Sequence, residues 1–550
     1  MSKDTLRMAI GFVVIMAILI VWQTAFRPTA RPAAPVPVAA DSLAPSPEDS
    51  TARPVAPAVE TESAVRVPDE DQARDSRLVA FGIGEGEQVP EETVTLENDV
   101  LRLTFSSVGG SVNSAWLKKY EAELVPEGGQ LFTAGLLTPD ERFDLAGARF
   151  RVAASDTSVT FSIGNDSFGL VRTFVIDTGY AVRLVSVARG WSAVALGCPD
   201  GIAVTESNVK EDLTHFHFYL RNSGKVRTLA VKNLKQPVVD AGRLSWVAFK
   251  NKYFFVAAFD TVAGFDSTRV SATGDGRIAA SAVSRSPETA VTLYLGPLEY
   301  NRLNSFGLGL EGAVSLGFAK PVALAILWLL HLLYRVFGNW GVAIIIFAII
   351  MKAVFFPLTR TQTAQMRRMQ QLQPKLKELK KKYKDDAQAL NRETMQLYKL
   401  YKINPLSGCL PMLVQLPVFW ALYSVLRNFI ELRGAGFVLW LRDLSQPDTL
   451  FGHLPFFGNP AIGLLPILMG LSFIAQNMLT SADKKNWAMT IIFPIFITAI
   501  FLNFPSGLQL YWFMYNVLSI VESLVGLKGG MPWTKRRDTR AVAPVPTGKL

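Results

Sequence analysis

Cysteine and histidine are scarce in this sequence of 550 residues, which has two of the former and four of the latter. Cys198 lies in a polar, strand-like region and Cys409 at the edge of an apolar run, so a shared disulfide is not expected. His215 and His217 share a strand face without a third ligand at metal-binding spacing, which favours an ordinary surface pair over a metal site. No redox chemistry, metal or other cofactor is therefore expected.

Signatures of enzymes are also weak. The glycine-rich stretch "GIGEG" at residues 82–86 is followed by no helical pattern, so it does not read as a phosphate-binding loop. No group of nucleophile, base and orienting residue is apparent elsewhere along the chain. We therefore expect a protein that is not an enzyme.

Acidic residues are outnumbered by basic ones, 46 to 56, which gives a net charge of +10. Lysine and arginine crowd into short loops beside apolar runs, which indicates membrane topology rather than binding to a nucleic acid sequence. The composition agrees, since 49% of the residues are hydrophobic and the mean hydropathy is +0.24. The lipid bilayer is the first partner that the sequence implies.

The first 91 residues predict an anchor followed by a tether. Lys3 and Arg7 precede an apolar run, so residues 1–26 read as a transmembrane anchor, with a cleaved signal peptide as the alternative. The anchor is favoured because the run is long and ends in bulky aromatic residues. Residues 27–91, rich in proline and alanine, predict a disordered linker.

Residues 92–317 predict a β-sandwich domain outside the cytoplasm. Leu101, Leu103 and Phe105 alternate with polar residues at the period of a strand, and Gly109-Gly110 is one of several turn signals between such runs. At about 200 residues the segment is long enough for one sandwich.

The remainder, residues 339–527, predicts five membrane crossings interrupted by a charged insertion. The insertion, residues 359–407, has leucines at three- and four-residue spacing and predicts a hairpin of two short helices, with Asp386 as the cap of the second. It has about three basic residues for every acidic one, which places it in the cytoplasm. Crossings are expected near residues 341–358, 410–430, 462–479, 487–504 and 508–527.

Two flanking segments complete the predicted topology. Residues 318–338 contain His331 and Arg335 and leave too short a turn before the next run, which favours an interfacial amphipathic helix over a crossing. Residues 528–550 form a basic cytoplasmic tail. The predicted fold is an α+β membrane protein with both termini in the cytoplasm and the β-domain on the other side.

Lys352 is the residue that best indicates a functional site. It lies within the apolar stretch "IIIFAIIMKAVFFP" at residues 344–357, where a lysine costs about 2.5–3.5 kcal/mol on insertion scales. Its backbone is eight residues, about 12 Å, from Arg360, so snorkelling would close only part of that gap. Two alternatives stay open, an internal ion pair with Glu522 and the lining of a hydrated cavity.

Further polar residues enter the apolar runs and strengthen the cavity hypothesis. Singly, each is more often a hydrogen-bond partner in helix packing than part of a site. Pro411 and Pro417 would kink the crossing near residues 410–430 and leave backbone groups for such a cavity to satisfy. The polar residues are Gln415, Gln476, Asn477, Asn503, Asn516 and Ser519.

Three long motifs resemble the membrane core of the YidC/Oxa/Alb insertases. They are "GNWGVAIIIFAIIMKAVFFPLT" (residues 338–359), "YKINPLSGCLPMLVQLPVFWALYSVL" (401–426) and "FPSGLQLYWFMYNVLS" (504–519). In addition, "ENDVLRLTFSSVGGSVNSAWLKKY" (97–120) is similar to the start of the periplasmic domain found in family members from bacteria with two membranes.

The resemblance implies a membrane protein insertase and chaperone of the bacterial inner membrane, whose five core helices enclose a hydrated groove. Lys352 occupies the position of the groove's basic residue, which is usually arginine, so charge is kept but bidentate grip on a carboxylate is lost. Tyr511 and Trp512 match aromatic positions along the client's path. Gln415, Gln476 and Asn516 are further groove candidates, and Glu522 is the candidate ion-pair partner of Lys352.

The implied partners are nascent membrane proteins, the ribosome and the Sec translocon. The hairpin and tail are candidates for contact with the ribosome, signal recognition particle or its receptor, although topology and solvation alone also explain their charge. The rival function is a small-solute transporter with Lys352 as counter-ion. No internal repeat, the usual mark of such transporters, is found for residues 341–358.

Overall fold

The computed structural model describes residues 90–527 except 140, 261–262, 318, 402–409, 454–459 and 481–486. The predicted anchor, almost all of the predicted linker and the predicted basic tail lie outside the described residues. What is described falls into two units that meet in sequence between Gly296 and Pro297.

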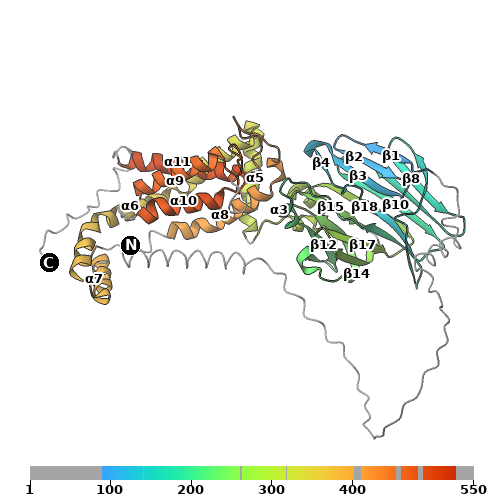
Figure 1. Cartoon of the computed structure of the whole chain (residues 1–550), viewed down its shortest axis with the longest axis horizontal. Helices are drawn as coiled ribbons and strands as arrows, with labels where there is room; N and C mark the ends of the chain where they lie inside the picture. Colours follow the sequence, from blue (N-terminus) through green and yellow to red (C-terminus); the bar gives the residue numbers. More distant parts are fainter. Residues whose placement is uncertain are drawn as a thin grey trace, which may run out of the picture. The chain divides into compact units, whose positions relative to one another are not determined.

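The first unit begins with a four-stranded antiparallel sheet (Figure 1), made of β1 (Thr93–Glu97), β2 (Leu101–Ser106), β3 (Ser111–Leu117) and β4 (Ala122–Glu123). Leu101, Leu103 and Phe105 are fully buried while Arg102 between them is exposed, so the predicted alternation is confirmed. Gly109 has φ +77°, and a Cβ there would lie 2.8 Å from the carbonyl oxygen of Ala146, so the predicted turn requires glycine at that position.

A fourteen-stranded antiparallel sheet makes up most of the same unit, and its chief path runs β6-β5-β11-β17-β16-β14-β15-β18-β10-β9-β8-β7, with β12 and β13 joined to β14. Of the predicted β-sandwich, the structure confirms a large domain of antiparallel sheets. The strands are β5 (Thr133–Leu137), β6 (Arg142–Asp144), β7 (Arg151–Ala154), β8 (Ser158–Gly164), β9 (Gly169–Ile176), β10 (Ala181–Arg189), β11 (Ala193–Cys198), β12 (His217–Asn222), β13 (Lys225–Ala230), β14 (Val238–Lys250), β15 (Phe254–Phe259), β16 (Phe265–Ala272), β17 (Ile278–Ser284) and β18 (Glu288–Pro297).

Arg172 ties separate parts of this domain together from within its core. Its side chain is fully buried on β9, donates from Nη1 to the carbonyl of Gly110 at 2.7 Å and from Nη2 to that of Phe132 at 2.8 Å, and lies 5.2 Å from the ring centre of Phe174. Two backbone carbonyls that burial would otherwise leave without donors are thus satisfied by one side chain.

The second unit is helical, and the predicted apolar runs coincide with its helices. They are α4 (Tyr300–Ser305), α5 (Lys320–Phe337), α6 (Trp340–Lys382), α7 (Ala387–Leu400), α8 (Leu410–Asn428), α9 (Leu464–Thr480), the π-helical η6 (Ala488–Ile492), α10 (Phe493–Phe501) and α11 (Ser506–Leu527), with short 3-10 turns η3 (Leu310–Ala313) and η5 (Ile430–Leu432). Two stretches within the described residues, Lys320–Phe337 and Trp340–Arg360, are long and apolar enough by themselves to cross a membrane.

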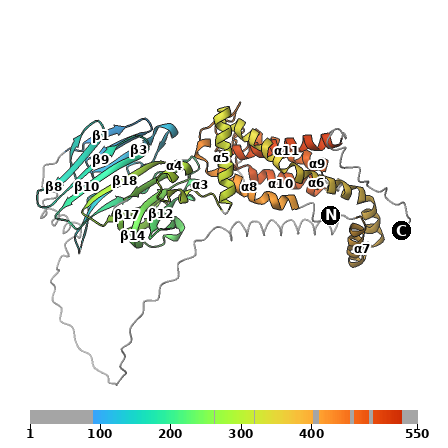
Figure 2. The same ribbon diagram turned by 180° about the vertical axis from the view of Figure 1, so that it is seen from behind.

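Helix α5 runs across one end of the bundle, whereas α6, α9, α10 and α11 run along it, as the two opposite views show (Figure 1, Figure 2). The change of direction is made by two residues. Gly338, at φ +65°, ends α5 in the left-handed conformation, and the side chain of Asn339 accepts from the backbone N–H of Val342 to begin α6. The core of the unit lies where these helices meet and includes Ala343 and Phe347, both almost fully buried.

The predicted helical hairpin differs from the structure in its first arm. No break separates that arm from the preceding crossing, because α6 continues for 43 residues through Pro357 and Pro374. A proline removes only one N–H, and the leucine, glutamine and lysine residues that follow favour a helix. The predicted cap is confirmed, since Asp386 accepts from the N–H groups of two residues in the first turn of α7, at 3.0 and 2.9 Å.

The pairing of the two hairpin helices is also evident. Lys375 of α6 donates to the hydroxyl of Tyr401 at 2.5 Å, and Leu372, Leu376 and Leu397 are buried between the helices. The leucine spacing therefore predicted the correct seam.

Candidate functional site

Lys352 lies at the contact between α6 and α11, with only 12% of its side chain exposed. Its Nζ is 2.8 Å from Oε2 of Glu522 and donates to Oγ of Ser519 at 2.7 Å. The same ammonium group lies 4.9 Å from the ring centre of Tyr515, which adds a cation–π interaction. Four side chains thus form a polar cluster in an otherwise apolar part of the bundle.

The spacing of the α11 partners explains why they meet Lys352 together. Tyr515, Ser519 and Glu522 are separated by four and three residues, so they lie on one face of the helix. Ser519 donates its own hydroxyl proton to the carbonyl of Tyr515 at 2.8 Å, so its oxygen lone pairs are available to accept the hydrogen bond from Lys352. Glu522 further accepts from Thr359 of α6 at 3.5 Å, beyond a good hydrogen-bond length.

Electrostatics make Glu522 the principal partner of Lys352. The carboxylate is 20% exposed, so both charges are largely removed from water and neither is well solvated alone. Breaking a fully buried pair by deleting one partner costs about 3–5 kcal/mol, because the other charge is left without compensation. Of the two alternatives raised by the sequence, the internal ion pair is the arrangement that the structure contains.

Tyr511 and Trp512 begin an aromatic wall on α11, one to two turns before this cluster. Tyr511 is 2% exposed and its ring centre lies 5.9 Å from that of Phe347. The Trp512 ring lies 5.9 Å from Phe419 of α8 and 6.0 Å from Phe501 of α10. Within the described part of the chain, the Tyr511 hydroxyl and the Trp512 indole N–H are buried without a hydrogen-bond partner.

The remaining predicted groove residues occupy different environments. Asn516 is 1% exposed and donates to Oγ of Ser472 on α9 at 3.1 Å, so it links α11 to α9. Gln415 of α8 and Gln476 of α9 are half-buried. The structure therefore joins Lys352 with Glu522 and Ser519, and it does not bring Asn516 into that cluster.

Tyr515 and Thr359 were missed as partners by reasoning from the sequence. The signal for Tyr515 was its position four residues before Ser519 and seven before Glu522, which repeats along one helical face. Thr359 offered no such signal, because its proximity to Glu522 depends on how two helices 163 residues apart in sequence are packed.

Comparisons with known proteins identify the family. A model of the YidC periplasmic domain matches residues 93–329, and one of the 60Kd inner membrane protein matches residues 332–531. The membrane protein insertase YidC of Pelobacter propionicus is 35% identical over 473 residues, which are 79% of this chain and 86% of that protein. The chain belongs to the YidC family of membrane protein insertases. The resemblance stated from the sequence is therefore confirmed.

Other YidC proteins give the same result. The insertase of Citrifermentans bemidjiense is 34% identical over 78% of this chain and 84% of its own length. A crystal structure of an active YidC insertase with its first transmembrane domain resolved aligns over 82% of this chain and 96% of its own, at 18% identity and a TM-score of 0.39. As a YidC insertase, the protein is an inner membrane protein with a periplasmic domain and not an enzyme.

Proposed function

We propose that this YidC protein inserts nascent membrane proteins by letting a polar client segment exchange places with Glu522 at Lys352. The observation that carries the proposal is the cluster itself, a lysine held at 2.8 Å from a carboxylate within an apolar bundle. Such a charge is costly in a membrane protein and usually serves a function. The apolar walls then allow the following client helix to partition into lipid.

Exchange of partners suits an insertase better than binding to an unpaired charge. A client carboxylate that replaces Glu522 substitutes one anion for another, so the net gain in Coulomb energy is small. A weak net gain permits release, which an insertase needs after every client. Ser519 and the Tyr515 ring would hold the ammonium group in place while the partners change.

The aromatic wall supports the same path. The buried hydroxyl of Tyr511 and the indole N–H of Trp512 have no hydrogen-bond partner within the described residues, at a cost that a native structure usually compensates by function or bound water. In the proposed mechanism they donate to backbone carbonyls of a client that is not yet helical. Gln415 and Gln476 are proposed to line the hydrated groove that leads to them.

The topology that accompanies this mechanism is also a proposal. The helices α6, α8, α9, α10 with η6, and α11 would cross the membrane, and the hairpin of α6 and α7 would lie in the cytoplasm. Helix α5 would lie in the outer interface, which the crosswise course in Figure 1 and Figure 2 supports. The ribosome and the Sec translocon are proposed partners on the cytoplasmic side and within the membrane.

A depletion and crosslinking experiment tests this function. Cells depleted of the protein should accumulate uninserted small membrane proteins, and a photocrosslinker at Trp512 or Gln415 should label a stalled nascent chain. Lys352→Arg should preserve insertion, because charge is retained, while Lys352→Ala should lose it for clients with acidic tails. Normal insertion combined with lost uptake of one solute would instead support a transporter, and full activity of Lys352→Ala with every client would refute the role of the lysine.

A further inference from the structure

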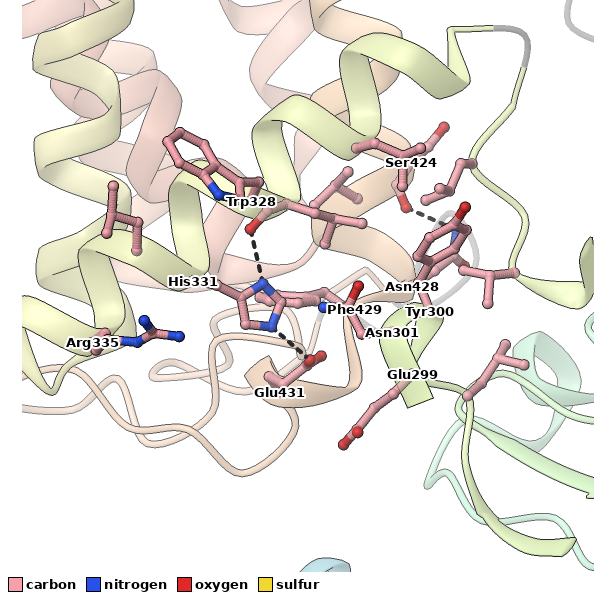
Figure 3. A pocket seen from close by; sticks show the side chains of 17 residues that line it. Glu299, Tyr300, Asn301, Trp328, His331, Arg335, Ser424, Asn428, Phe429 and Glu431 are labelled. Atoms are coloured by element: carbon pink, nitrogen blue, oxygen red, sulfur yellow. Dashed lines mark hydrogen bonds and ion pairs between the residues drawn. The ribbon is translucent and has the colours of Figure 1, made fainter. Parts of the chain in front are cut away.

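A cavity of about 300 Å³ lies beside α5, and its lining includes none of the four residues of the Lys352 cluster. It is lined by residues of α4, α5, α8 and η5, all of which belong to the helical unit (Figure 3). Its volume falls at the lower end of the range for small-molecule sites, roughly 300–1,000 Å³. Neither the family assignment nor the proposed insertion mechanism gives this cavity a role.

Cationic groups line one side of the cavity. Nδ1 of His331 is 2.8 Å from the carbonyl oxygen of Leu327, and Nε2 is 3.1 Å from Oε1 of Glu431. Since both neighbours are acceptors, the doubly protonated imidazolium satisfies both contacts beside the Glu431 carboxylate. Arg335 follows His331 by one helical turn, and Figure 3 shows its guanidinium directed toward the His331–Glu431 pair.

Carboxylates and neutral polar groups complete the lining. Glu299 forms an ion pair with Arg302 at 3.0 Å, and Asn428 donates to the carbonyl of Ser424 at 2.9 Å. Each carboxylate can accept more than one donor, so pairing with a neighbour leaves Glu299 and Glu431 able to receive an ammonium group. The cavity therefore offers sites for a cation and an anion a short distance apart.

The outer surface of α5 indicates what kind of molecule reaches this cavity. Trp328, Leu332 and Val336 follow one another at four-residue spacing, so they share one face of α5, and they are 67%, 40% and 67% exposed, which is unusual for large apolar residues in contact with water. An apolar helix face of this kind is typical of contact with lipid. Leu324 and Trp328 also line the cavity, so its apolar edge is continuous with that face.

We propose that this cavity binds a phospholipid whose headgroup carries both a phosphate and a primary ammonium group. Arg335 would bind the phosphate, Glu299 and Glu431 would accept from the ammonium, and an acyl chain would run along Leu324 and Trp328. Such a lipid would link α5 to α8 and η5 and hold it at the membrane surface. The inference rests on the proposed function only for the position of α5 at lipid.

Native mass spectrometry of the purified full-length protein tests the proposal. After delipidation, the protein is titrated with dioctanoyl phosphatidylethanolamine, phosphatidylglycerol and phosphatidylcholine. We expect the first to bind most tightly, because phosphatidylglycerol lacks the ammonium and phosphatidylcholine lacks its N–H donors. Loss of one charge-assisted contact in Arg335→Gln should weaken that binding about tenfold. Glu299→Gln should remove the preference over phosphatidylcholine.

Arg442→Gln provides the matched control, because Arg442 is exposed in the same unit and does not line the cavity. It should change the affinity less than about twofold. Equal binding of all three lipids, or equal effects of the two arginine variants, would overturn the proposal. Lys352→Ala should leave lipid binding intact, which separates a failure here from a failure of the insertion mechanism.

Photocrosslinking distinguishes a lipid from a client in the same space. A diazirine on the acyl chain of phosphatidylethanolamine should label peptides that contain Leu324 and Trp328. If a photocrosslinker at Trp328 instead captures a stalled nascent chain and the lipid labels other regions, the cavity belongs to the client and the lipid assignment is wrong.

Discussion

Removal of the Glu522 charge gives the sharpest test of the Lys352 cluster. In Glu522→Gln the ammonium keeps Ser519 at 2.7 Å and the Tyr515 ring at 4.9 Å but loses its anion at 2.8 Å. A fully buried pair would lose about 3–5 kcal/mol, and the 12% and 20% exposure of the two side chains reduces this to about 1–3 kcal/mol. Lys352→Met should cost a similar amount, since it leaves Glu522 uncompensated.

The double variant makes the test quantitative. Lys352→Met combined with Glu522→Gln leaves no uncompensated charge, so its loss of stability should be smaller than the sum of the single losses by about 1–3 kcal/mol. Thermal unfolding of the purified protein in detergent, followed by intrinsic fluorescence, measures all four forms. Glu378→Gln is the matched control, because Glu378 is exposed on the hairpin part of α6 and should leave stability unchanged.

Glu522→Gln also distinguishes an ion pair with a purely structural role from a site that binds clients. If a client carboxylate must displace Glu522, removal of the Glu522 charge should increase the lifetime of the contact between Lys352 and an acidic client about tenfold. Clients with neutral tails should be unaffected. Crosslinking yield to a stalled client reports this contact. Strictly additive single losses, or equal changes for acidic and neutral clients, would refute the reasoning.

Two further predictions concern other parts of the chain. Burial lowers the pKa of Lys250 to about 8, whereas the pKa of a lysine in the unfolded chain is about 10.4. Between these two pH values the unfolded state binds more protons than the folded state, so the free energy of unfolding should rise with pH by up to about 3 kcal/mol. Lys250→Met should raise the melting temperature at pH 7 and lose this advantage by pH 10, and parallel pH profiles would contradict it. Asp386→Ala should destabilise α7 by about 0.5–2 kcal/mol through loss of the cap, detected as faster limited proteolysis of the hairpin, whereas Asp385→Ala should not.

The boundaries of the helices show which local patterns were informative. The apolar run at residues 462–479 corresponds to α9 within two residues, and Asp386 caps α7 as its position before a leucine repeat predicted. The long α6 differs from the prediction because the charged residues from position 359 mark the end of the apolar run and not the end of the helix, which continues through Pro357 and Pro374. Helix propensity summed over several turns therefore outweighs the loss of one N–H at a proline.

The candidate site was predictable in part for a related reason. Lys352 stood out because a charge in an apolar helix is rare whatever surrounds it, and Glu522 was identified as a partner by its matching depth alone. Depth in the membrane did not distinguish Asn516 from Ser519 as a second partner. The rotation of α11 about its axis decides between them, and it turns Ser519 toward Lys352 and Asn516 toward Ser472.

The cavity beside α5 had no counterpart in the sequence. His331 and Glu431 are 100 residues apart, and no periodicity links the last turns of α5 to the short turn η5 after α8. Their meeting depends on how α5 crosses the bundle, which side-chain packing determines.

The sequence by itself determined the membrane character of the protein, its division into a strand-rich part and a helical part, and the presence of one charge that required a partner. These properties follow from composition and period, which act over a few neighbouring residues. Only the tertiary structure decided that Lys352 is held by Glu522, Ser519 and Tyr515, and that a mixed-charge cavity lies beside α5. Such contacts join distant segments, so they depend on the packing and rotation of whole helices.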